Sequence, residues 1–120
     1  MAQAGSSGRG RRFAAKYADT IVVKARTLDY ARQWVQGGVP IIHHQNVKSR
    51  LFGMFQKLEA ARALVRRVAI ADATLPGGVP FQYAASAKVF ATQTAFEIAH
   101  DAVQTLGGNG LTHEYLAEKL

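Results

Sequence analysis

The chain has 120 residues, of which 48% are hydrophobic, and a formal net charge of +7. This length accommodates one domain with a modest core, and no apolar run is long enough to span a bilayer. The absence of cysteine excludes disulfides and thiolate metal sites, whereas the positive charge is compatible with an anionic surface, nucleic acid or a phosphate-bearing ligand.

Residues 1–11 are predicted to form a disordered basic arm. The segment consists mainly of small and polar residues, has no acidic residue and carries Arg9 and Arg11. An arm that binds nucleic acid is one interpretation, and salt-dependent binding to DNA or RNA would test it. We expect no nucleic-acid partner, because the basic residues of the helix predicted next are not gathered on one stripe.

A first long helix is predicted from Arg12 to Gln36. Its apolar residues recur at helical spacing. They are Phe13, Tyr17, Ile21, Leu28, Ala31 and Val35. Gly37, Gly38 and Pro40 are expected to end this helix.

The following loop, Gly37–Gln45, contains two adjacent histidines, His43 and His44. Adjacent side chains point in different directions, and the remaining histidines, His100 and His113, lie far along the chain. The sequence therefore offers no clustered ligand set, and we predict no metal site. A hydrogen-bonded loop or helix-cap pair is the structural interpretation of the two histidines.

A second helix is predicted from Asn46 to Thr74. Its apolar residues keep a 4-3-4-3 spacing, which is typical of packing along antiparallel helices. They are Val47, Leu51, Met54, Leu58, Ala61, Val65 and Val68. The basic residues Lys57, Arg62, Arg66 and Arg67 lie off this seam and are expected to be solvated. A turn at Pro76–Pro80 should end the helix.

A third helix is predicted from Phe81 to Leu106, with a seam of mainly small residues. The seam consists of Ala84, Ala87, Ala91, Ala95, Ile98, Ala102 and Leu106. Gly107 and Gly108 should stop the helix, and Thr112 is a candidate cap for a short helical stub that follows. Such a corner exposes backbone N–H groups near Gln104, so it suits a polar or anionic ligand, with a plain helix corner as the alternative.

The predicted fold is all-α: an up-down antiparallel bundle of three long helices plus a short C-terminal helical stub. The C-terminal stretch DAVQTLGGNGLTHEYLAEKL, residues 101–120, resembles the C-terminal signature of the acyl-CoA dehydrogenase family. The positions that match are Asp101, Ala102, Val103, Gln104, Gly107, Gly108, Gly110, Glu114, Tyr115, Glu118, Lys119 and Leu120. The stretch differs from the signature at Leu111 and Leu116, where the family usually has an aromatic residue and a proline.

A second stretch carries the same resemblance. Tyr30, Ala31, Gly38, Pro40, Ile41, His44 and Gln45 match the family pattern around its histidine–glutamine loop. The resemblance implies that residues 12–120 form part of the C-terminal helical domain of an acyl-CoA dehydrogenase.

The resemblance also implies a chemistry. Members of the family use FAD to oxidise the α,β-carbon bond of an acyl-CoA thioester, with a glutamate as base. In most members that glutamate lies beyond the last residue of this chain. We therefore expect a fragment without the catalytic base, with no catalytic residue of its own and no activity alone.

In the family, the histidine–glutamine loop and the glycine corner contact FAD that is held by a neighbouring subunit. The implied cofactor contacts are Trp34, Gln36, His44, Gln45, Gln104, Thr105, Leu106, Gly107 and Gly108. Trp34 stands at the position of a family arginine that approaches the diphosphate, so its role is stacking on the cofactor or packing in an apolar interface.

The resemblance further implies a homo-oligomer, acyl-CoA binding only together with the family's other domains, and no membrane partner. For location we expect the cytoplasm, with the mitochondrial matrix as the alternative. A non-catalytic helical interaction or scaffold bundle is the alternative function.

Overall fold

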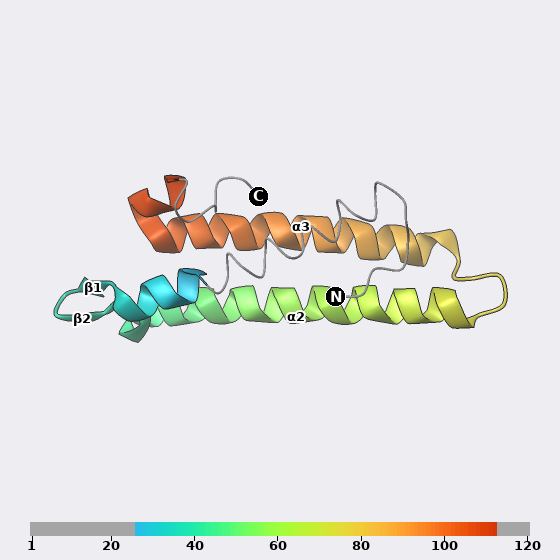
Figure 1. Cartoon of the computed structure of the whole chain (residues 1–120), viewed down its shortest axis with the longest axis horizontal. Helices are drawn as coiled ribbons and strands as arrows, with labels where there is room; N and C mark the ends of the chain where they lie inside the picture. Colours follow the sequence, from blue (N-terminus) through green and yellow to red (C-terminus); the bar gives the residue numbers. More distant parts are fainter. Residues whose placement is uncertain (1–25, 113–120) are drawn as a thin grey trace.

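The structure is a computed structural model that describes residues 26–112. Two long antiparallel helices, α2 (Gln45–Thr74) and α3 (Phe81–Leu106), lie side by side along its length (Figure 1). The described part of a first helix, residues 26–33, packs near the start of α2. The all-α prediction is confirmed, as are the two long helices, to within one residue at each end.

The first helix ends earlier than predicted. Its last helical hydrogen bond runs from the Trp34 N–H to the Tyr30 carbonyl, at 2.8 Å. Instead of continuing the helix to Gln36, the chain forms a small antiparallel hairpin of β1 (Val35–Gln36) and β2 (Val39–Pro40). The extension of this helix to Gln36 was therefore wrong.

Turn chemistry explains the early end of the helix. Gly37 and Gly38 both have positive φ, at 64° and 83°. A two-residue hairpin turn of type I′ needs positive φ at both central positions, which glycine adopts without steric cost, and the β-branched Val35 and Val39 favour strand. The 3-10 turn η1 (Ile41–His43) then leads into α2.

The predicted seam of α2 faces α3. The main core contains Met54, Leu58 and Ala61 of α2 and Ala91, Ile98, Ala102 and Leu106 of α3. A second cluster of Ala31, Ile41 and Val47 attaches the short helix and η1 to α2. Ala84 is exposed, so the buried seam of α3 begins one turn later than predicted, at Ala87.

The predicted turn between the long helices is also present. Gly77 and Gly78 have φ of 84° and 75°, and the Val79 N–H donates to Asp72 Oδ1 at 3.0 Å. At the other end of α3, Gly107 (φ 59°) stops the helix as predicted, and the 3-10 turn η2 (Gly107–Leu111) follows. The Gly77–Gly78 turn thus connects the two long helices, and Gly107 marks where α3 ends.

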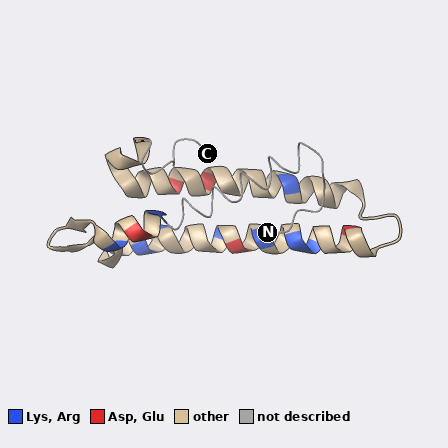
Figure 2. Cartoon of the chain, viewed as in Figure 1, with Lys and Arg blue, Asp and Glu red and all other residues tan. Residues whose placement is uncertain are grey.

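Three predictions lie outside the described residues: the basic arm 1–11, the first helix before residue 26, and the helical stub after Thr112. Within residues 26–112, no helix is both long and apolar enough to cross a membrane. Most of the basic side chains described lie on α2 (Figure 2).

Candidate functional site

The described parts of the two stretches that resemble the flavoenzyme family lie at the same end of the helix pair (Figure 1). Asn109 in η2 donates from Nδ2 to the Tyr30 hydroxyl at 3.2 Å. The Tyr30 ring stacks on Trp34, with centroids 5.5 Å apart and planes 12° apart. This chain of contacts joins the glycine corner to the hairpin across 79 residues of sequence.

His44 ties the hairpin to the start of α2. Its Nε2 lies 3.1 Å from the Gln36 carbonyl oxygen. Because a carbonyl only accepts, this hydrogen bond requires the proton on Nε2. For His44, the interpretation as a hydrogen-bonded loop residue is therefore confirmed. His44 also occupies the N-cap position of α2 with an extended backbone, but its side chain makes no capping hydrogen bond.

The first turn of α2 carries no acidic residue, and within it the Val47 N–H donates to Asn46 Oδ1 at 2.9 Å. Gln45, its first residue, is exposed. The first N–H groups of a helix lack intrahelical partners and carry a partial positive charge. Next to the hairpin, this end of the molecule therefore presents the exposed side-chain amide of Gln45 and the N-terminus of α2.

The glycine corner presents backbone on the other side. Gly107 and Gly108 are exposed, and a Cβ added at either glycine would meet nothing within 4 Å. Gln104, one turn earlier in α3, is exposed as well. A ligand therefore has access both to an amide side chain and to bare backbone at this corner.

Two of the predicted contact residues point inward. Leu106 is 2% exposed and belongs to the main core, and the buried Thr105 hydroxyl donates to the Asp101 carbonyl at 2.8 Å. Their side chains serve packing and the helix itself, so any contact they make with a ligand runs through the backbone. Trp34, in contrast, is 51% exposed beside its stacking partner Tyr30.

The chemistry of this end suits a dinucleotide. Neither residues 34–46 nor residues 104–112 contain an aspartate or glutamate, so no carboxylate on these segments repels a diphosphate. Amide side chains and backbone N–H groups supply donors, and an exposed indole supplies a flat apolar face. Within residues 26–112, no group of three or more metal-ligating side chains occurs.

Two residues of this end were given no role by sequence reasoning. Tyr30 was part of the family match, but its contact with Asn109 appears only in the fold. Asn109 falls at a variable position of the signature, and nothing in its neighbours indicates a partner 79 residues away.

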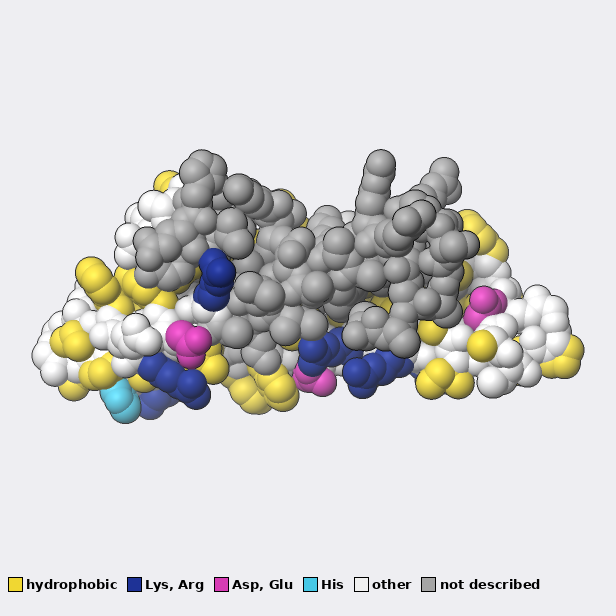
Figure 3. Space-filling model, in the orientation of Figure 1, with side chains coloured by type: hydrophobic (Ala, Val, Ile, Leu, Met, Phe, Trp, Pro, Cys, Tyr) yellow, Lys and Arg dark blue, Asp and Glu magenta, His cyan; other side chains and the backbone are white. Residues whose placement is uncertain are grey.

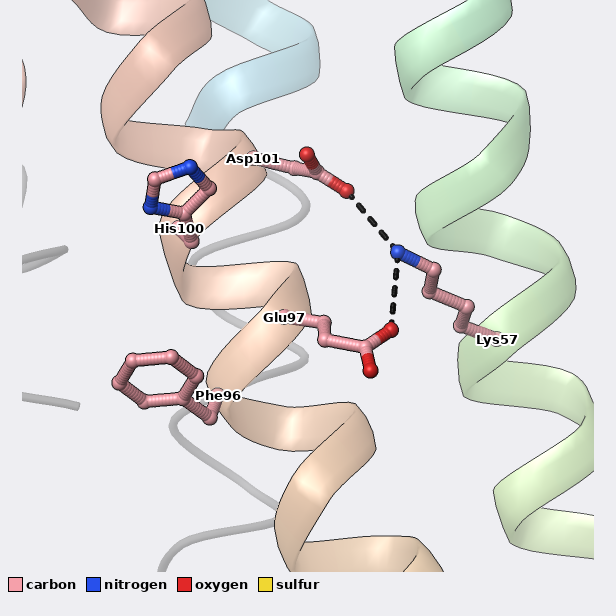
Figure 4. Close-up of a pocket in the computed structure, with 5 residues that line it drawn as sticks. All are labelled: Lys57, Phe96, Glu97, His100 and Asp101. Carbon is pink, nitrogen blue, oxygen red and sulfur yellow. Dashed lines mark hydrogen bonds and ion pairs between the residues drawn. The ribbon is translucent and has the colours of Figure 1, made fainter.

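A second polar cluster lies between the long helices. Lys57 Nζ of α2 is 3.1 Å from Glu97 Oε2 and 3.3 Å from Asp101 Oδ2 of α3 (Figure 4). An open pocket of about 280 Å³ beside them is also lined by Phe96 and His100, which point away from Lys57. The Lys57 side chain is 37% exposed, so it stays partly solvated as expected, and the two carboxylates also hold it beside the helix interface.

The environment of Lys57 affects its protonation. Partial burial lowers the pKa of the ammonium group, but hydrogen bonds to Glu97 and Asp101 and their negative charges outweigh it. The net result raises the pKa of Lys57 above its ordinary value of 10.5.

Comparison with known proteins places these observations in a family context. A family model described as acyl-CoA dehydrogenase, C-terminal domain, matches residues 5–120. An acyl-CoA dehydrogenase of Bacillus subtilis (strain 168) is 41% identical over 93 residues, which cover 78% of this chain and 24% of that protein. Cyclohex-1-ene-1-carbonyl-CoA dehydrogenase of Syntrophus aciditrophicus (strain SB) is 36% identical over 101 residues, which cover 79% and 23%.

A solved structure shares the fold and holds a flavin. The structure titled "PigA with FAD and proline" superposes with a TM-score of 0.81 at 25% identity, covering 89% of this chain and 27% of that one. The chain thus spans about a quarter of the length of the relatives it matches, 23% and 24% for the two dehydrogenases.

Proposed function

We propose a function from the premise that this chain belongs to the acyl-CoA dehydrogenase family, through its match to the C-terminal domain. Members of the family are flavoproteins that bind FAD and acyl-CoA. The proposal is that the end formed by the hairpin and the glycine corner contacts FAD that a neighbouring subunit holds. The observation that carries it is the Asn109–Tyr30–Trp34 chain of contacts, which unites the two motifs.

The residues have distinct roles in this proposal. Gln104 and the backbone N–H groups of Gly107 and Gly108 donate hydrogen bonds to polar atoms of the cofactor. Gln45 and the N-terminus of α2 face its negative charge, while His44 holds the hairpin and the exposed face of Trp34 covers an aromatic ring. FAD, when bound, supplies the oxidant for removing two hydrogens from the α and β carbons of an acyl-CoA.

This chain's part in that reaction is orientation rather than proton transfer. Neither residues 34–46 nor residues 104–112 contain a carboxylate, so we assign no general base to this end. We expect no turnover when the 120-residue chain is assayed with acyl-CoA, FAD and a dye acceptor. Turnover by the purified chain would overturn this part of the proposal.

Nuclear magnetic resonance with isotope-labelled chain tests the cofactor contact directly. We expect the isolated chain to bind FAD weakly, so the titration runs to millimolar concentrations. Chemical-shift changes should gather at His44, Gln45, Gln104, Gly107 and Gly108, and spare the turn at Gly77–Gly78. ADP and riboflavin, titrated separately, distinguish contacts to the diphosphate from contacts to the flavin ring.

A matched pair of variants sharpens the test. Gln104→Ala should weaken the FAD-dependent shifts at the corner, whereas Gln82→Ala, an exposed glutamine at the far end of the same helix, should leave them unchanged. The proposal would be contradicted if no chemical shift changed at millimolar FAD. It would also be contradicted if the changes spread over the whole helix pair. A micromolar or tighter constant for the isolated chain would contradict the expected half-site.

The exposed apolar side chains favour association with further protein. Phe52 and Phe55 of α2 stack at 6.3 Å, and Phe90 and Phe96 of α3 are 42% and 67% exposed. Figure 3 shows hydrophobic side chains at the surface of the face it presents. We propose that copies of this chain associate through such side chains.

The same side chains favour a second candidate function, a non-catalytic interaction bundle. In that case the helix pair binds protein but its hairpin end binds no flavin. The FAD titration separates the two candidates, because only the first predicts shifts that gather at the hairpin and the corner.

A further inference from the structure

The alanines on the buried side of α3 specify the position of the two long helices along their axis only weakly. Five buried residues of α3 are alanines, Ala87, Ala91, Ala95, Ala99 and Ala102, and they stand beside the larger buried Ile98 and Leu106. Equal small side chains offer few distinct pockets, so the alanines discriminate little between registers that differ by one helical turn. A polar contact that is complete in one register adds to the selection made by the larger side chains.

The bridge formed by Lys57 is suited to select the register. Its two acceptors, Glu97 and Asp101, stand one turn apart on α3, and Lys57 reaches both at 3.1 and 3.3 Å. A shift of one turn, about 5.4 Å, would leave Lys57 beside only one of them. The other carboxylate would then stay at the interface without this cation, which is costly for a partly buried charge.

The position of the bridge connects it to the candidate site. Asp101 lies only six residues before Gly107, where α3 stops and the corner begins. The register at Lys57 therefore fixes how far the corner extends beside helix 26–33, where Asn109 meets Tyr30. The turn that joins α2 to α3, where the Val79 N–H donates to Asp72, lies at the opposite end of the helix pair, far from the corner and the hairpin (Figure 1).

We propose that Lys57 is a positioning residue that selects the register of α2 against α3 and thereby places the glycine corner level with the hairpin. The consequence for ligand binding rests on the proposed function, but the register itself does not. The two parts are therefore measured separately.

The register is measured by distance between two spin labels. The chain has no cysteine, so Ser49→Cys and Ser86→Cys, two exposed serines on α2 and α3, label it at defined points. Pulsed electron–electron double resonance on the labelled chain should give one distance between the two spin labels. Lys57→Met, which keeps the side-chain stem but removes the charge, should add a second distance displaced by about 5 Å, one helical turn.

Two controls keep the result specific. Lys57→Arg should restore the single distance, because it returns a cation to the two carboxylates. Arg67→Met, which removes an exposed positive charge from the same helix, should leave the distance unchanged. A single unchanged distance in Lys57→Met would overturn the proposal, as would the same second distance in Arg67→Met.

Circular dichroism reports whether Lys57→Met is still helical. Should it unfold, Asp101→Asn carries the test, since it removes one of the two negative charges that face Lys57 and leaves Glu97. This variant should show the second distance, and an unchanged single distance would overturn the proposal. In the FAD titration, the wild-type chain should show chemical-shift changes at the glycine corner and Lys57→Met should lose them. That result would support the effect of the register on FAD binding. Wild-type chain without shifts removes the proposed function but leaves the register result standing.

Discussion

Two glycines of the corner, only two residues apart, have opposite surroundings. Gly110 is buried, and a Cβ there would lie 2.8 Å from both the Cα and the carbonyl oxygen of Val103. Gly108 is exposed, and a Cβ there would meet nothing within 4 Å. An alanine substitution therefore tests packing against α3 at Gly110 and changes only the exposed surface of the corner at Gly108.

Gly110→Ala should destabilise the chain by about 1–3 kcal/mol, because backbone of α3 must move to admit the methyl group. Gly108→Ala should change the stability by less than about 0.5 kcal/mol, as an exposed substitution. Urea unfolding followed by circular dichroism measures both. Equal stability of the two variants would show that the close approach of Gly110 to α3 is not maintained in solution.

For individual residues, part of the candidate site could be predicted from the sequence. Exposed Gln45, Gln104, Gly107 and Gly108 were named from spaced motifs and lie at one end of the fold. The contact between Asn109 and Tyr30 was beyond reach, because it joins positions 79 residues apart and neither belongs to a local pattern with that meaning. Side-chain direction was missed as well, since Thr105 and Leu106 share the motif but face the core.

Among the elements, the long helices were the most predictable part of the fold. Their apolar periodicity runs over many turns, and proline and glycine mark where they end. The end of the first helix was mispredicted because Val35 continues the helical spacing while the Gly37–Gly38 pair favours a hairpin turn. At such a boundary local turn chemistry outweighed a periodic pattern.

The bridge between α2 and α3 predicts a defined pH dependence of stability. The pKa of Lys57 is raised in the fold, so its stabilising contribution is complete below 10.5 and is lost as pH rises through the higher folded value. The stability difference between wild type and Lys57→Met should thus stay constant from neutral pH to about pH 10 and shrink above it.

Urea midpoints across this range measure that difference. Lys88→Met, which removes an exposed lysine from α3, serves as the control and should give a small difference throughout. A Lys57 contribution that disappears well below pH 10 would contradict the bridge.

The described residues form a long and narrow body, with extents of 59 × 26 × 20 Å. Large apolar side chains of its two long helices are exposed, among them Phe81 and Ile70 at 83% and 64%. We expect the chain to self-associate at micromolar concentration, which light scattering coupled to gel filtration measures. Phe96→Gln, at an exposed position of α3, should shift the population toward monomer, whereas Gln93→Ala on the same helix should not. A clean wild-type monomer would argue against the proposed association.

The stacked pair of Tyr30 and Trp34 has an optical consequence. Trp34 is the only tryptophan of the sequence, so light absorbed selectively by indole reports from a single location, beside the hairpin. Its emission should be red-shifted, since about half of the residue's surface is exposed. The unlabelled chain thus carries its own intrinsic reporter, and a yellow chromophore arriving at that end should quench it by energy transfer.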